Sequence, residues 1–469
     1  MDLIVYAVPF FVIAMLVELV YGVVRGRNTY RLNDSVSSLF MGVLSQARRF
    51  VTLGIGGYVY YLISGHLSLP QMDTSDWWTW VLAFVLYDFC YYWLHRLGHE
   101  RTILWAAHVA HHQSEEYNLT TALRQTSTGF LFGWIFYIPM FVLGIPAEVV
   151  VTVGSLNLLY QFWVHTEHVP KLGWYEWFFV TPSNHRVHHA QNDIYMDRNY
   201  GGVFILWDRM FGSFQEELDE EPVIFGIRGP LRSFNPWHAM THVYVDMFMD
   251  SWRARDWRDK LRVWVARTGW QPADVAASHP RCKNDLSTFE KYDPRVPGVV
   301  AWYGFFQLLA VVVLLTVMQW SELAYWPGVS LWALLLFTTV TTALWLDARG
   351  KSGAMKWEVI RLAYASGLIL FGFFSAAPAG ILLAGITYLF ANGLFLAVLV
   401  RRVDTPRVAA VDTTGAGDAF VGCFSAQLAS GQSEADALSA AVRYAALSVT
   451  AQGTHDAYAD AAAFARWMP

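Results

Sequence analysis

The sequence predicts an all-α integral membrane protein, in which a bundle of membrane-spanning helices carries a cap on one side of the bilayer. Composition is the first reason: of the 469 residues, 55% are hydrophobic and only 15% are charged, whereas soluble proteins usually carry about 25% charged residues. Long apolar runs are the second reason. The third is a set of spaced histidine clusters beside these runs, which indicates a metal site at the end of the bundle.

Several stretches have the composition of a membrane span, which needs roughly 20 apolar residues. The stretches at 130–164 and 362–400 are long enough for helical hairpins, with turns near Gly144 and Pro378. Arg48 and Arg49 interrupt one stretch and weaken it as a span. In chain order the stretches are 3–24, 36–63, 77–94, 130–164, 298–318, 329–346 and 362–400.

The basic residues between these stretches predict an orientation, because cytoplasmic loops carry an excess of Lys and Arg. The loops at 65–76 and 319–328 contain neither residue, whereas Lys or Arg follows the alternate stretches. We therefore expect the histidine clusters, the segment 213–297 and the C-terminus to face the cytoplasm, and the N-terminus to face outward. The net charge of −5 indicates no nucleic-acid partner. Oligomeric state is not predicted.

Ten of the fifteen histidines lie between His95 and His189. Residues three or four apart share a face of a helix, so each cluster can present two or three imidazoles to one cavity. Eight imidazoles exceed the capacity of one ion, and a structural zinc site closes with four ligands. The apolar surroundings then predict oxidation of a lipid by a pair of irons, and a metal transporter is the weaker alternative. The clusters are His95 and His99; His108, His111 and His112; and His185, His188 and His189.

Three further residues are candidates for the same site. His165 is a possible ninth ligand, and His168 is a weaker one. Asp88 lies two helical turns before His95 and on the same face as His99. We expect it to accept a hydrogen bond from the second nitrogen of a ligating imidazole.

The histidine clusters lie in sequences that resemble the sterol desaturase and fatty acid hydroxylase superfamily. Residues 87–99, 108–112 and 184–189 are similar to its first, second and third signatures, and residues 197–202 and 207–213 are also similar to it. Within the superfamily, the segment 163–169 and the further spans after residue 298 most resemble alkylglycerol monooxygenases. The resemblance covers roughly residues 1–400.

This resemblance implies a cytoplasmic cap over a di-iron site, with Asp88, Glu100 and Asp197 beside the ligands. Glu100 resembles an acidic position of the ether-cleaving enzymes, and either holds a reductant or caps a helix. By position in the signatures, the implied iron ligands are His95, His99, His108, His111, His112, His185, His188 and His189.

The implied reaction uses O2 to hydroxylate a lipid C–H bond. In an alkylglycerol, hydroxylation beside the ether oxygen gives a hemiacetal that separates into a fatty aldehyde and glycerol, and the reductant is tetrahydrobiopterin. The alternative is a sterol or fatty acyl hydroxylase or desaturase that takes electrons from an electron-transfer protein. The chain has no haem motif or Rossmann glycine signature, so the reductant must come from outside the chain.

The segment 250–262 alternates Trp with Arg, which suits an interfacial helix. The same pattern is compatible with an ordinary cap helix that has salt bridges on its solvent face. Of these two interpretations we favour the cap helix. The predicted division of the chain is a core with its cap at 1–297, additional membrane hairpins at 298–404, and a small C-terminal fragment at 405–469.

The C-terminal fragment is unlike the rest of the chain. Residues 408–420 are similar to the second signature of ribokinase-like sugar kinases. The resemblance implies that Gly415, Ala416 and Gly417 form an anion hole at a helix N-terminus and that Asp418 is the base. Only roughly 65 residues of that fold are present, so we expect no sugar kinase activity and interpret the fragment as a fusion remnant. A nucleotide-binding regulatory tail is the alternative.

Overall fold

The computed structural model describes residues 3–48, 54–125, 128–321, 323–348, 351–374, 379–400 and 411–450. Within these residues the regular structure is helical, apart from two isolated β-bridges, Phe179–Phe204 and Ala190–Phe225. The predicted all-α class is confirmed. The chain divides into two compact units, residues 1–388 and 389–469, and each is described by itself.

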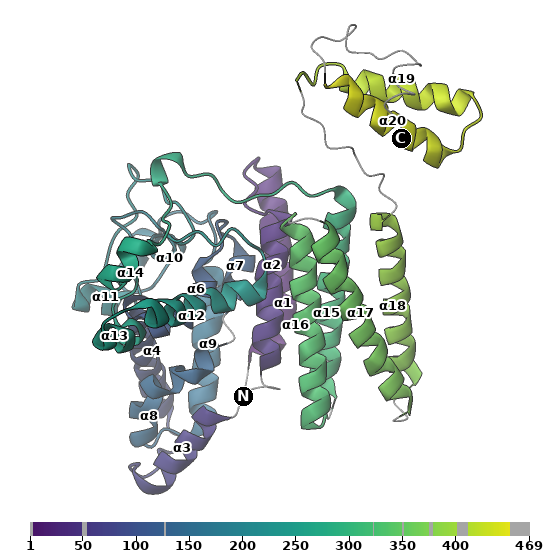
Figure 1. The fold of residues 1–469 in the computed structure, drawn as a ribbon. Helices are drawn as coiled ribbons and strands as arrows, with labels where there is room; N and C mark the ends of the chain where they lie inside the picture. The colour runs from purple at the N-terminus through teal and green to yellow at the C-terminus, as the bar shows by residue number, and fades with distance from the viewer. Residues whose placement is uncertain are drawn as a thin grey trace. The chain divides into compact units, whose positions relative to one another are not determined.

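Long apolar helices form one side of the first unit (Figure 1). Three of the described helices are long and apolar enough to cross a membrane: α1 (Ile4–Val24), α15 (Gly298–Trp320) and α16 (Tyr325–Leu346). The helices α17 (Lys351–Phe374) and α18 (Ala379–Val400) follow in the order expected for the last hairpin. Its predicted turn at Pro378 lies outside the described residues. The chain is therefore an integral membrane protein.

The stretch 36–63 is not one span. It contains most of α2 (Leu32–Ala47) and of α3 (Ile55–His66), and residues 49–53 lie outside the described part. Helix α2 packs against α15, α16 and α7 (Leu119–Leu123), and it buries polar side chains such as Asp34 and Ser38. A helix with these buried groups needs protein partners on its surface rather than lipid.

The stretch 130–164 also differs from the predicted hairpin. It begins with short helical turns that include α8 (Ile138–Val142), and a single long helix follows, α9 (Ala147–Trp163). The turn falls at Gly144 as expected, with φ of +74°. A Cβ atom there would lie 2.5 Å from the carbonyl oxygen of Pro70, so only glycine fits this turn.

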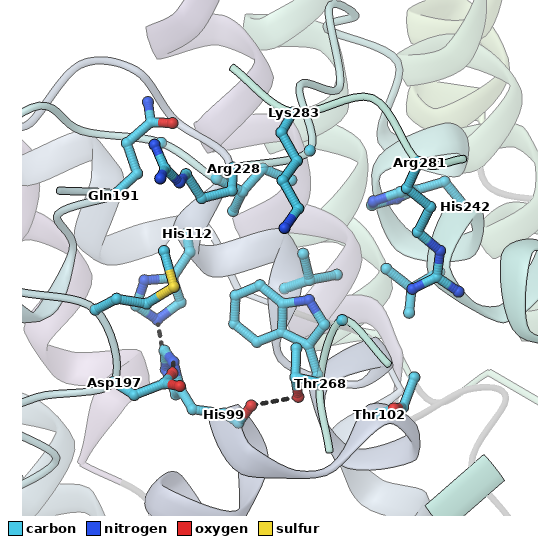
Figure 2. Close-up of a pocket in the computed structure, with 18 of the residues that line it drawn as sticks. His99, Thr102, His112, Gln191, Asp197, Arg228, His242, Thr268, Arg281 and Lys283 are labelled. Atoms are coloured by element: carbon cyan, nitrogen blue, oxygen red, sulfur yellow. Dashed lines mark hydrogen bonds and ion pairs between the residues drawn. The ribbon is translucent and has the colours of Figure 1, made fainter. Parts of the chain in front are cut away.

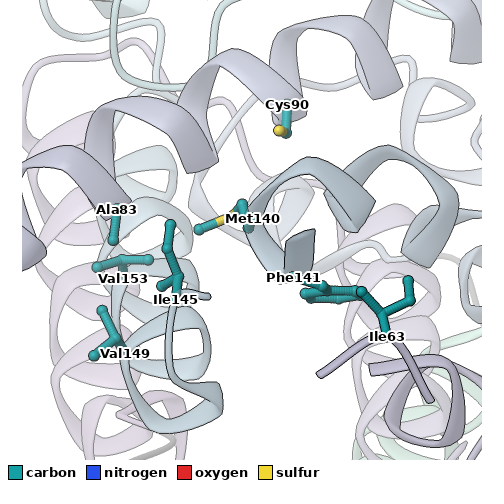
Figure 3. Close-up of a cluster of buried hydrophobic side chains, with 8 residues drawn as sticks. All are labelled: Ile63, Ala83, Cys90, Met140, Phe141, Ile145, Val149 and Val153. Atoms are coloured by element: carbon teal, nitrogen blue, oxygen red, sulfur yellow. The ribbon is translucent and has the colours of Figure 1, made fainter. Parts of the chain in front are cut away.

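Helix α4 (Trp77–Glu100) packs against α9 and α8 through an apolar core that Figure 3 shows. Ala83 and Cys90 of α4 meet Met140 of α8 and Val153 of α9 in this core. The contact is close, because a Cβ at Gly154 would lie 2.9 Å from the Tyr87 ring. This packing fixes the end of α4 beside the end of α9, where the histidines begin.

Short helices build the cap around these two helix ends. Two begin with a capping box: α7, whose cap is Asn118, and α10 (Pro182–His188), whose cap is Thr181. Such caps satisfy the free amides of helices too short to be stable alone. The remaining cap helices are α5 (Thr102–Ala106), α6 (Val109–His112), α11 (Leu206–Phe211), α12 (Pro236–Arg253), α13 (Trp257–Val265) and α14 (Ala273–Ser278).

The described part of the second unit contains α19 (Ala416–Ala429) and α20 (Glu434–Ser448), which pack against each other. Gly415 precedes α19 with φ of +81°, a conformation that favours glycine. Ala416, Gly417 and Asp418 form the first turn of α19.

Candidate metal centre

Nine histidines converge in the cap in two groups. Within each group, one nitrogen atom from every ring lies within 4.8 Å of the others. The structure thus brings together all eight histidines singled out in the sequence and the possible ninth, His165. The weaker candidate, His168, lies against the ring of Tyr21 instead. The first group is His95, His99, His108, His112 and His188, and the second group is His111, His165, His185 and His189.

Each H-x-x-H-H cluster divides between the two groups. His108 and His112, four residues apart, join the first group, whereas His111 joins the second. In the other cluster the assignment is reversed: His185 and His189, which are also four residues apart, join the second group. His188 then joins the first. The two clusters therefore lie between the groups, and each serves both.

Backbone carbonyls fix the orientation of four of these rings. The Nδ1 atom of His95 lies 2.8 Å from the carbonyl oxygen of Tyr200, and that of His188 lies 2.9 Å from the carbonyl oxygen of Arg198. His111 is paired in the same way with Arg124 at 2.9 Å, and His165 with Gln161 at 2.8 Å. A carbonyl only accepts, so each Nδ1 carries the proton and each Nε2 presents a lone pair.

These lone pairs face one another. The Nε2 atoms of His111 and His165 are 3.3 Å apart, and neither has a proton to share. The Nε2 atom of His188 is buried and has no hydrogen-bond partner among the residues that the structure describes. Such buried acceptors are unfavourable unless a cation lies between them, and neutral imidazole nitrogen is a preferred ligand of iron and zinc. The donor set therefore fits transition metal ions.

Burial keeps the imidazoles neutral. It lowers the pKa of His111 to about 4 and holds the pKa values of His108, His112, His185 and His189 well below their usual range. Neighbouring imidazoles lower the last four pKa values further, and the Arg124 charge lowers that of His111, because a second positive charge at such short range is unfavourable. The rings are therefore ready to bind metal at neutral pH without first losing a proton.

Asp88 has a different role from the one expected. Its carboxylate accepts four hydrogen bonds within the described residues, and none of the donors is an imidazole. The donors are Asn157 Nδ2 at 2.7 Å, the Val203 amide at 2.8 Å, the Phe204 amide at 3.0 Å and Trp207 Nε1 at 2.9 Å. Asp88 thus joins α4 to α9 and to the segment that carries the Tyr200 carbonyl, and it acts on His95 only through that segment.

Asp208 is a residue that the sequence reasoning missed. Its carboxylate accepts the amides of Tyr200 and Gly201, each at 2.7 Å, and the Ser213 hydroxyl at 2.7 Å. It therefore fixes the peptide that orients His95. Asp208 lies in the run 207–213 that resembles the superfamily, but the spacing alone did not indicate which backbone it would hold.

Glu100 and Asp197 occupy different surroundings. The Glu100 carboxylate accepts from Arg96 Nε at 2.9 Å. Asp197 lies 3.8 Å from His99 Nδ1, with φ of +58°. Burial and the nearby Glu100 charge raise the pKa of Asp197 to about 6.

A cavity of about 240 Å³ lies beside the first histidine group. His99, His112 and His188 contribute to its wall, together with Trp105 and Asp197. Figure 2 shows Gln191, Arg228 and Lys283 on the side of the cavity away from His99 and Asp197. Glu100 is not among the described residues that line it.

Comparison with known proteins gives the class of this centre. Residues 80–213 match the family model of fatty acid hydroxylases, and these residues contain all nine converging histidines. Residues 394–461 match the model of the pfkB family of carbohydrate kinases. No solved structure matches the chain. The helical membrane fold and the histidine centre therefore define a membrane-bound lipid oxygenase, an iron-dependent oxidoreductase of the fatty acid hydroxylase class.

Relatives narrow the class to a family. The chain is 36% identical over 358 residues to alkylglycerol monooxygenase of Xenopus tropicalis. The aligned region covers 76% of this chain and 79% of that protein. It is 37% identical over 376 residues to the Danio rerio enzyme of the same name, covering 78% and 82%. With the Homo sapiens enzyme it shares 40% identity over 269 residues, covering 57% and 59%. The chain belongs to the alkylglycerol monooxygenase family.

Proposed function

We propose that the protein is a di-iron monooxygenase that cleaves the ether bond of alkylglycerols to a fatty aldehyde and glycerol. The observation that carries this proposal is the division of nine buried imidazoles into two groups, in a chain whose relatives are named alkylglycerol monooxygenases. Five of these imidazoles would hold one iron, and the other four would hold the second. When bound, the irons supply the O2 activation that the organic side chains cannot.

The protein residues hold and shield the site. Carbonyl oxygens of Tyr200, Arg124, Gln161 and Arg198 orient four imidazoles before metal arrives. Preorganisation of this kind lowers the cost of binding and fixes the reacting geometry. The ligands are buried, apart from His108, which is partly buried, so bulk water is kept from the reacting carbon.

The cavity beside the first group supports an ether lipid over a plain acyl chain. The carbon to be hydroxylated is bonded directly to the ether oxygen, so the glycerol must lie within a few bonds of the metals. Within a largely apolar lining, the cavity offers polar groups at that place: Asp197 beside His99, and Gln191 and Lys283 on the side away from His99. A carboxylate and an amide can each hydrogen-bond glycerol hydroxyls.

The reductant comes from outside the chain, and we propose tetrahydrobiopterin, as the family implies. We also propose that the cap and its histidine centre face the cytoplasm, because the loops on that side carry the basic residues. The pfkB-like segment contributes no catalysis in this proposal. Its described part contains two helices, and all nine proposed ligands precede residue 190.

The test supplies each reductant separately to membranes that contain the protein. Conversion of a 1-O-alkylglycerol to fatty aldehyde with tetrahydrobiopterin supports the proposal. Turnover only with a cytochrome or ferredoxin system would assign the chain to the sterol or fatty acyl alternative and leave the metal assignment intact.

A further inference from the structure

Large apolar side chains are exposed on α12 and α13, and six of them lie between residues 245 and 265. They repeat every three or four residues, so on each helix they share one face. The opposite faces are buried, through Met240 and Met247 of α12 and Val263 of α13. The exposed side chains are Val245, Phe248 and Trp252 on α12, and Trp257, Leu261 and Val265 on α13, each between 54% and 74% exposed. We call these six residues the apolar face; a patch of this kind marks an interaction surface.

Basic residues surround the apolar face. Residues 250–262 contain five basic and three acidic side chains. One of the acids, Asp250, is buried and paired with Arg281 at 2.5 Å. Arg255, between the two helices, and Arg258, in the first turn of α13, are both exposed. The face therefore combines large apolar and aromatic groups with excess positive charge, as helices at a lipid surface do.

Both ends of the α12–α13 pair are fixed at the ends of long helices. Before α12, the Ser233 hydroxyl and the Phe234 amide each donate to Asp347 at 2.6 Å, and Asp347 directly follows α16. After α13, the Thr102 amide donates to the Ala266 carbonyl at 3.1 Å, just beyond the end of α4. Because α16 is long enough to cross the membrane and ends at Leu346, α12 begins where the chain leaves the bilayer.

The direction of α12 agrees with this placement. Figure 1 shows α12 running across the long helices rather than along them. A helix that starts at the exit of a span and runs across it follows the bilayer surface. The opposite side of the same helix lines the histidine cavity through His242, Val243 and Asp246.

We propose that the apolar face of α12 and α13 is a membrane-docking surface, which inserts into the interface of the bilayer that holds the spans and prefers anionic headgroups. This favours the interfacial reading of residues 250–262 over the plain cap helix. Helix α12 then separates the lipid headgroups from the histidine cavity by one helix diameter. The docking surface does not depend on the reaction that the metal centre catalyses.

Spin labels measure the depth of the face in the full-length protein in nanodiscs. Phe248→Cys and Leu261→Cys are labelled in a chain that carries Cys282→Ser and Cys423→Ser, because Cys90 is buried. Asp219→Cys is the matched control, since the Asp219 side chain is 98% exposed. We expect the two labels on the face to collide about tenfold less than the control with a water-soluble nickel complex, and more with oxygen.

Two results would overturn this surface. One is collision with nickel equal to that of the Asp219 control, which would place the face in water. The other is dipolar broadening between labels on different chains, which would show that a second copy covers the face. A separate experiment tests the preference for anionic headgroups. Adding anionic lipid should increase the depth of the Leu261 label in the bilayer, and the double variant Arg255→Glu with Arg258→Glu should remove that increase. An equal depth in neutral and anionic nanodiscs would contradict the preference for anionic headgroups.

Discussion

His111 and His165 face each other through Nε2 atoms that are 3.3 Å apart, although both nitrogens are acceptors. Each ring donates its only proton from Nδ1 to a carbonyl, of Arg124 and of Gln161 respectively. Two lone pairs at this distance repel unless a cation lies between them. This relationship makes His165 a full member of the second group rather than a neighbour of it.

The first prediction concerns that ninth ligand. His165→Ala should lower the bound iron by about one ion per chain and reduce turnover by more than about 100-fold, since removing residues that only support a ligand already costs roughly 10- to 100-fold. His168→Ala is the control and should keep both values near those of the unchanged protein. Iron content by mass spectrometry and aldehyde formation are measured together. Full iron content in His165→Ala would remove it from the ligands.

The second prediction concerns the peptide behind His95. Asp208→Asn should weaken iron binding about 10- to 100-fold, because an amide cannot accept from both backbone amides and the Ser213 hydroxyl as the carboxylate does. Asp193→Asn changes an acid whose side chain is 84% exposed and should have little effect. Titration of the metal-free proteins with ferrous iron compares the two. Equal affinities would show that the Tyr200 peptide does not control the site.

The third prediction separates the two acids beside His99. Asp197→Asn should raise the KM for alkylglycerol about tenfold or more, because a hydrogen bond to a charged group contributes about 1.5–3 kcal/mol. Asparagine tolerates the positive φ at this position, so the backbone should not change. Glu100→Gln should alter the same constant less than about threefold, since its partner is Arg96. A larger effect of Glu100→Gln on the KM for the reductant would place the reductant at Glu100.

The fourth prediction concerns the pfkB-like segment. Truncation after Val403 and Asp418→Ala should each leave the rate of ether cleavage within about twofold, because the proposed ligands all lie in the other unit. The same truncated protein should bind a labelled ATP analogue no less than the full chain. A nucleotide-dependent change in rate that Asp418→Ala abolishes would instead show a regulatory tail.

The sequence was sufficient to predict the helical membrane class and which histidines come together, because both follow from composition and local spacing. It could not predict that each H-x-x-H-H cluster divides between two groups, since this depends on how the short helices α6 and α10 are oriented by their neighbours. The hydrogen-bond donors to Asp88 could not be predicted either. The predicted helix face of Asp88 was correct, but its donors are residues 115 to 119 positions further along the chain and a residue of α9.

The stretch at 36–63, which its paired arginines already made doubtful as a span, could not be interpreted fully for a related reason. Its apolar residues suggested lipid, whereas its buried Ser37 and Ser38 hydrogen-bond to protein groups, and Ser38 does so to Asp34 just before the stretch. Asp34 accepts from the Ser114 hydroxyl at 2.7 Å, a contact between residues 80 positions apart. Polar residues within an apolar stretch are therefore interpretable only once their distant partners are known.

The measurement that tests the central claim most directly is the fate of oxygen during ether cleavage. The purified protein with iron and tetrahydrobiopterin is given a 1-O-alkylglycerol under 18O2, and the aldehyde is trapped at once by reduction to the alcohol. Hydroxylation of the carbon beside the ether oxygen predicts one 18O atom in the fatty alcohol and none in the glycerol, with product lost in His111→Ala and His188→Ala. A fatty alcohol without 18O, or equal product from the histidine variants, would contradict a di-iron monooxygenase that acts on ether lipids.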